Sequence, residues 1–122
     1  MFNSLHINED NMKLLVSGSQ CIRNFDLSEY INNDTTLIIS GGNVGIDTIA
    51  EEYADKHGIS KLILRPNYKI YPDSASFIRD EQMVDICDAV LLIWDGKSQD
   101  IIHIIKCVNK LCKPIRIFLF QS

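Results

Sequence analysis

The segment from Leu37 to Ala54 carries the residue types best placed to do chemistry. An apolar strand runs into a glycine-rich turn, Gly41–Gly45, and an amphipathic helix follows at once. Such a turn aims free backbone N–H groups and a helix N-terminus at one point, which is the usual way an α/β protein holds a phosphate. We therefore predict a ligand contact at four of its residues: Gly41, Gly42, Asn43 and Gly45. The alternative is a tight turn that needs glycine only for its positive φ angles.

The glycine spacing excludes two common nucleotide sites. Gly41-Gly42-x-x-Gly45 differs from the dinucleotide fingerprint GxGxxG, and the Lys-Ser/Thr pair of a P-loop does not follow it. This argues against metal-assisted nucleoside triphosphate chemistry. Asp47 falls in the first turn of the expected helix, where it either stabilises the helix dipole or accepts a hydroxyl from a ribose-like ligand.

A second polar cluster, Trp94-Asp95-Gly96-Lys97-Ser98, ends an apolar strand. Lys97 could pair with a phosphate, and Ser98 could hydrogen-bond to it. The alternative is a turn in which Ser98 caps the next helix and Lys97 faces solvent. Asp100 would then lie in the first helical turn, where it favours the helix dipole and repels an anion.

Arg79 has Asp80, Glu81 and Asp85 nearby on an expected helix, so we predict a surface ion pair, with a phosphate-facing role only if that helix leans over the strand ends. His103 and Cys107 have the i, i+4 spacing of two metal ligands on a helix. Because no second pair accompanies them, we expect core packing and no metal site. No arrangement of Ser, Cys or His predicts a nucleophile and its base, so no catalytic residue is assigned.

Composition fits one domain, with an irregular lead-in over residues 1–11 and a single domain over 12–122. Hydrophobic residues make up 46% of the 122, enough for a core. A net charge of −4 and a pI near 5.2 argue against a nucleic acid partner. The four cysteines form no CxxC pair. With neither a leader peptide nor an apolar run of about 20 residues evident, we expect a cytoplasmic protein away from membranes.

Strand and helix patterns alternate along the chain. We expect strands at 12–16, 36–39, 61–64, 89–94 and 115–120, and helices at 25–31, 44–57, 74–87 and from Ser98 onward. This order predicts an α/β Rossmann-like three-layer sandwich with a five-stranded, mostly parallel, doubly wound sheet. Ligands of such sheets bind beyond the carboxyl ends of the strands. Three loops converge there, at Gly18-Ser19-Gln20, Gly41–Gly45 and Asp95–Ser98.

From about Met12 to Phe120 the chain resembles the SLOG (SMF/DprA–LOG) superfamily, in its branch of small bacterial and phage proteins of the YspA/YAcAr type. The resemblance is carried by short motifs in a fixed order: Leu15-Val16-Ser17-Gly18-Ser19, Ser40-Gly41-Gly42-x-x-Gly45-x-Asp47-x-x-Ala50-Glu51, Phe77-Ile78-Arg79, Met83, Asp88-Ala89-Val90 and Trp94-Asp95-Gly96-Lys97-Ser98. It implies a domain that binds a nucleotide-derived ligand, works as a homodimer and needs no cofactor. It adds Gly18, Ser19, Arg79 and Ser98 to the expected ligand-binding residues.

Three departures from that branch fall in the expected pocket. Gln20 stands where the branch tends to have Arg, Asp80 where it tends to have Asn, and Asp100-Ile101 where it tends to have Gly-Thr. Each makes the pocket less favourable to anions, so we expect a non-catalytic binding domain with an altered pocket.

Three alternatives stay open. The first is an enzyme like the nucleoside-monophosphate phosphoribohydrolases, whose PGGxGTxxE motif does not appear here. The second is a DprA-like binder of single-stranded DNA, against which the acidic charge counts. The third is a partner-binding domain that has lost its ligand.

Overall fold

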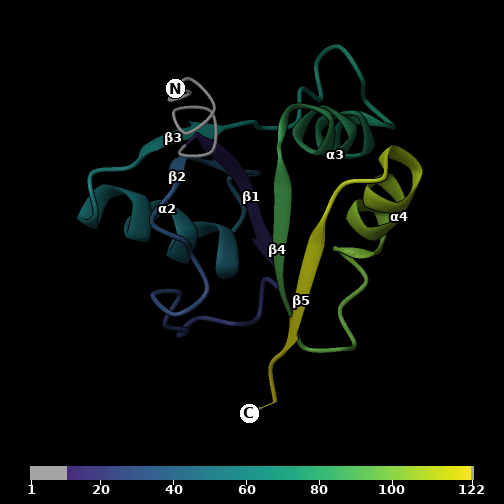
Figure 1. Ribbon diagram of the computed structural model, residues 1–122. Coiled ribbons are helices and arrows are strands. Elements are labelled where there is room, and N and C mark those ends of the chain that lie inside the picture. Colours follow the sequence, from purple (N-terminus) through teal and green to yellow (C-terminus); the bar gives the residue numbers. More distant parts are fainter. Residues whose placement is uncertain (1–10, 122) are drawn as a thin grey trace.

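The computed structural model describes residues 11–121, in which five strands form one sheet (Figure 1). The strand order is β3-β2-β1-β4-β5, and every neighbouring pair is parallel. The strands are β1 (Met12–Gly18), β2 (Thr35–Ser40), β3 (Ser60–Ile63), β4 (Ala89–Trp94) and β5 (Ile115–Leu119). The expected α/β fold with a five-stranded, doubly wound sheet is therefore confirmed. The lead-in expected over residues 1–11 lies, apart from Asn11, outside the described residues.

Helices cover both faces of this sheet. Figure 1 shows α2 (Ile46–Lys56) on one side, and α3 (Ala75–Ile86) and α4 (Ile102–Leu111) on the other. Each face has its own hydrophobic cluster, one built around α2 and the other around α3 and α4. The described chain is thus a Rossmann-like three-layer sandwich. None of its helices within residues 11–121 combines the length and apolar character needed to cross a membrane.

The central strands explain where a ligand would bind. From Val90 to Ile93, β4 is buried without a polar interruption, as expected for a strand covered on both faces. The chain builds the sheet outward from β1 to β2 and β3, then returns to place β4 on the other side of β1. The carboxyl ends of β1 and β4 therefore form the topological switch point of the sheet, the usual ligand position in such folds.

The helix expected at residues 25–31 is wrong, because this segment forms turns. Leu27 and Ile31 of this segment are nevertheless buried in the hydrophobic cluster around α2. The Asp26 carboxylate accepts the backbone N–H of Ser28 at 2.9 Å, which offers the backbone an alternative to helical hydrogen bonds.

The start of α4 also differs from expectation. The helix begins at Ile102, with Ile101 at its N-cap position, so Ser98 does not cap it. Asp100 consequently precedes the helix instead of lying in its first turn. This leaves residues 95–101 as a loop at the switch point.

The turn that enters α2 should be intolerant of any side chain. Gly45 has a φ of 81°, and a Cβ atom there would lie 2.6 Å from the carbonyl oxygens of Ser19 and Gln20. Gly58, just after α2, has a similar φ of 67° but no atom within 4 Å of that position. We predict that Gly45→Ala lowers the free energy of unfolding by at least about 3 kcal/mol, against about 1 kcal/mol for Gly58→Ala. Urea denaturation of both variants checks this, and equal losses would contradict the predicted crowding at Gly45.

Candidate functional site

The glycine-rich turn lies at the carboxyl end of β2 and is partly closed by its own side chains. The Gly42 N–H donates to Ser40 Oγ at 3.1 Å, and the Asn43 N–H donates to Asp47 Oδ2 at 3.1 Å. Within residues 11–121 the N–H groups of Val44 and Gly45 have no hydrogen-bond partner. The turn therefore offers fewer free donors than its glycines suggest.

Asp47 lies in the first turn of α2, as expected for a residue that stabilises the helix dipole, but its side chain makes no capping hydrogen bond. Its carboxylate accepts the Asn43 N–H, which precedes α2, and the N-cap residue Gly45 offers no side chain for capping. Asp47 is buried beside the turn, where it can also face a ligand.

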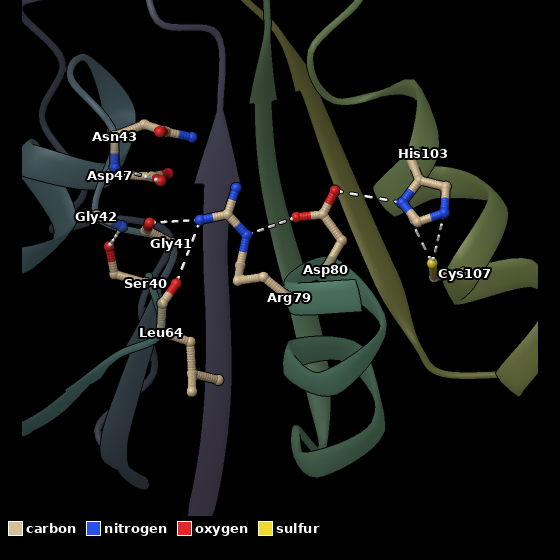
Figure 2. A network of polar contacts seen from close by, with 10 residues as sticks. All are labelled: Ser40, Gly41, Gly42, Asn43, Asp47, Leu64, Arg79, Asp80, His103 and Cys107. Carbon is tan, nitrogen blue, oxygen red and sulfur yellow. Dashed lines mark hydrogen bonds and ion pairs between the residues drawn. The ribbon is translucent and has the colours of Figure 1, made fainter. Parts of the chain in front are cut away.

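Arg79 on α3 is buried, with 6% of its surface exposed, so the predicted surface ion pair is wrong. Its Nη1 donates to Gly41 O at 2.5 Å and to Leu64 O at 3.2 Å, and its Nε donates to Asp80 Oδ1 at 2.9 Å. Figure 2 shows these contacts. Gly41 and Leu64 directly follow β2 and β3, so α3 does lean over the strand ends, as a ligand-facing role for Arg79 requires.

Gly41 allows this approach by lacking a side chain. A Cβ atom at this position would lie 2.9 Å from Arg79 Nη1 and 3.1 Å from Asp47 Oδ2. Glycine is needed here for space and not for a positive φ angle. The guanidinium and the Asp47 carboxyl are consequently brought together beside the same backbone atom.

These groups line a narrow polar cleft at the switch point, about 10 Å³ in volume, which is room for about one water molecule. Of the predicted site residues, the structure brings four to it: Gly18, Asn43, Asp47 and Arg79. Asp80 and Asp100 line it as well, so two of the three departures from the SLOG pattern face the cleft, whereas Gln20 does not line it. The remaining lining residues are Ser17, Met83, Ile101 and Ile104.

Carboxyl groups outnumber cations in this cleft. Burial raises the pKa of Asp47 to about 7, against the opposing effects of the Asn43 N–H and the Arg79 charge. Burial also raises the pKa of Asp80, although Arg79 and His103 favour its charged form. One guanidinium thus faces three carboxyl groups, counting exposed Asp100. The cleft suits hydroxyl donors better than it suits phosphate.

Ser19 and Ser98 hydrogen-bond to Asp95 in the loops and do not line the cleft. Ser19 is fully buried, and its hydroxyl donates to Asp95 Oδ1 at 3.2 Å and accepts the Asp95 N–H at 3.0 Å. The Ser98 N–H and hydroxyl both donate to the Asp95 carboxylate, at 2.7 and 2.8 Å. The backbone N–H groups of Ser98 and Lys97, followed by the Ser98 hydroxyl, hold the pKa of Asp95 well below its usual range. Asp95 therefore fastens the loops after β1 and β4 to each other.

Lys97 lies apart from the cleft. Its side chain is exposed and lines a separate hollow of about 410 Å³ that follows β1, β4 and β5. This hollow also includes Cys21, Ile22, Asp95, Phe120 and Gln121. Lys97 and Arg79 therefore do not form one anion site.

Sequence reasoning missed two parts of the site. Leu64 contributes only its carbonyl oxygen, which no residue-type pattern can reveal. Ser17, buried near the end of β1, lines the cleft and was overlooked although a polar residue at the end of an apolar strand could have marked it. Gly18 lines the cleft, but a Cβ atom there would overlap Ile93 O, so its role is also one of close packing.

Comparison with known proteins adds no family: no family model matches the chain, and neither does any curated protein. The SLOG resemblance therefore stays a prediction, and the function has to be argued from the cleft.

The raised pKa of Asp47 predicts a pH-dependent stability. Its folded pKa of about 7 exceeds the ordinary value of 3.8, so between these values the folded state binds more protons than the unfolded state. The free energy of unfolding should therefore fall as pH rises from about 4 to 7. Asp47→Asn keeps an acceptor oxygen for the Asn43 N–H and should remove this part of the slope, leaving the variant more stable than wild type at pH 8.

Denaturation at several pH values measures this slope, with Asp55→Asn as the control. Asp55 is an exposed carboxylate paired with Lys61 at the surface, so its replacement should leave the slope unchanged. An Asp47→Asn slope equal to that of wild type would refute the assignment.

Proposed function

We propose that this chain binds a nucleotide-derived small molecule at the carboxyl edge of β1, β2 and β4, as a binding domain and not as an enzyme. The observation that carries the proposal is the buried guanidinium of Arg79. Within residues 11–121 its third nitrogen, Nη2, has no hydrogen-bond partner, and in Figure 2 it points toward the side of Asn43 and Asp47. This leaves one guanidinium donor available to a ligand, and its position at the topological switch point supports a binding site there.

The charges of the cleft favour a sugar over a phosphate. Carboxyl groups accept hydroxyl hydrogens, and Arg79 donates to a hydroxyl or ring oxygen. A phosphate attached to the same ligand would lie outside the cleft, and the candidate donors to it are the N–H groups of Val44 and Gly45, which follow the cleft residue Asn43 in the chain. We therefore propose that the ribose occupies the cleft.

Binding requires the cleft to widen. A volume of about 10 Å³ holds one polar group, whereas binding sites for small molecules typically measure 300 Å³ or more. Asn43 and Asp100 come from separate loops, after β2 and after β4, and neither side chain is fully buried. Separation of these two loops is the movement that the proposal needs.

The first test is thermal unfolding with adenosine, guanosine, AMP, GMP and ADP-ribose, each added alone. A ligand at 100 times its Kd should add about 2.7 kcal/mol of stability. Asn43→Ala removes a cleft side chain but keeps the backbone, and should weaken binding about tenfold or more. Asp100→Asn removes a negative charge and should therefore raise the affinity for a phosphorylated ligand more than the affinity for its nucleoside.

Asn109→Ala is the matched control, because Asn109 is exposed on α4 and lies outside the cleft lining. Its affinity should equal that of wild type. The proposal is refuted if none of the five compounds stabilises the protein. It is also refuted if the Asn43→Ala variant binds a ligand as tightly as wild type does.

A second candidate is hydrolysis of a nucleoside monophosphate at its N-glycosidic bond. The pKa of about 7 at Asp47 favours it, because a general acid or base works best near the operating pH. Chromatography for released base tests this reading. Release by wild type that is lost in folded Asp47→Asn would favour the enzyme over the binding domain.

The proposal includes a homodimer in the cytoplasm. Cys21, Cys87, Cys107 and Cys112 are all free thiols, which suits a reducing compartment. The dimer rests on the SLOG resemblance, and sedimentation equilibrium measures it directly.

A further inference from the structure

Three potential metal ligands, one of them the buried Cys107, meet between α3 and α4. His103 and Cys107 lie one turn apart on α4, and Glu81 comes from α3, which packs against α4. One donor atom from each lies within 4.8 Å of the other two. From the sequence we expected the pair on α4 to pack in the core without a metal, and the third potential ligand becomes visible only when the two helices pack together.

The distance between the two ligands on α4 fits one metal ion. Cys107 Sγ lies 3.7 Å from His103 Nε2. Two ligands of a tetrahedral zinc ion, at about 2.3 Å for sulfur and about 2.0 Å for nitrogen, stand roughly 3.6 Å apart. These two donors are thus spaced as on zinc while the imidazole keeps the orientation in which Nδ1 lies beside Asp80.

The surroundings hold the imidazole in a suitable state. His103 Nδ1 lies 3.3 Å from Asp80 Oδ2, and the ring packs on Phe77 with centroids 4.4 Å apart. A carboxylate that accepts the Nδ1 hydrogen leaves Nε2 as the metal-binding nitrogen, the usual arrangement around zinc histidines. Asp80 therefore acts as a positioning residue for His103.

We propose that Glu81, His103 and Cys107 bind a zinc-type divalent cation with three protein ligands and an open fourth position. A mixed set of oxygen, nitrogen and sulfur donors suits zinc and disfavours magnesium and calcium. A groove of about 310 Å³ runs beside Glu81 and Cys107 and leaves room for water at the fourth position. Glu81 is exposed, so its carboxylate can close the remaining distance, while the Cys107 thiol gives its proton to solvent on binding.

This site is separate from the proposed ligand site and does not depend on it. Glu81 and Cys107 line the groove between α3 and α4, whereas the cleft lies at the carboxyl edge of the sheet. Loss of nucleotide binding would leave the metal proposal standing, and the reverse also holds.

The experiment is a titration of the reduced full chain with Co²⁺, followed by competition with Zn²⁺. Wild type should show one equivalent of a near-ultraviolet thiolate-to-cobalt band, displaced by zinc. Cys107→Ser should lose this band. Cys112→Ser, which changes an exposed thiol just after the same helix, should keep it at full intensity. Glu81→Gln and His103→Gln should weaken cobalt binding about tenfold or more.

The Glu81→Gln variant keeps the test decisive if Cys107→Ser fails to fold, because Glu81 is exposed and its replacement spares the core. The proposal is overturned if wild type shows no thiolate band at millimolar cobalt. It is equally overturned if Glu81→Gln binds cobalt as tightly as wild type, or if the band disappears in Cys112→Ser instead of Cys107→Ser.

Discussion

The site depends on one buried cation. Arg79 joins the ends of β2 and β3 to α3, because its Nη1 is shared between Gly41 O and Leu64 O. Both carbonyl groups sit where strands have ended and the sheet no longer supplies partners, so the guanidinium satisfies acceptors that would otherwise be left at a buried edge. A lysine could not replace it, since only a planar fork reaches the carbonyls and Asp80 together.

Charge balance around this cation explains the character of the cleft. Asp80 neutralises Arg79 at 2.9 Å, so little positive charge remains for an incoming phosphate. Asp47 lies in the same buried space, and its raised pKa shows that the remaining field of Arg79 does not compensate for burial. A strand-turn-helix segment of the phosphate-binding kind is thus combined with a cleft of acidic character, and for this reason we propose ribose as the group that occupies it.

The fold could be predicted from the sequence because it follows from local patterns. The uninterrupted apolar run of β4 and the 3.6-residue period of α2 each specify an element and its buried side without knowledge of the rest. The helix expected at residues 25–31 is wrong because the Asp26 carboxylate competes for the backbone N–H of Ser28, although Leu27 and Ile31 are buried in the core. Site residues were harder, since polar side chains such as Ser98 and Arg79 take their roles from loops and helices distant in sequence. The Ser98 hydroxyl donates a hydrogen bond to Asp95. The Arg79 guanidinium is buried and donates to backbone carbonyl groups, which a sequence pattern cannot reveal.

Asp80 shows how such distant contacts change the interpretation of a residue. In the SLOG pattern an asparagine tends to follow the arginine. Judged from the sequence alone, an aspartate at this position makes the pocket less favourable to anions. In the structure its two oxygens meet two different donors: Oδ1 accepts from Arg79 Nε, and Oδ2 lies 3.3 Å from His103 Nδ1. An asparagine has a single acceptor oxygen and would turn its NH₂ group toward one of these donors. The aspartate is therefore explained by the histidine on α4, and its charge is shared between two neighbours before any ligand arrives. Of the acidic departures, this leaves the exposed Asp100 as the one whose charge is free to oppose an anion at the cleft.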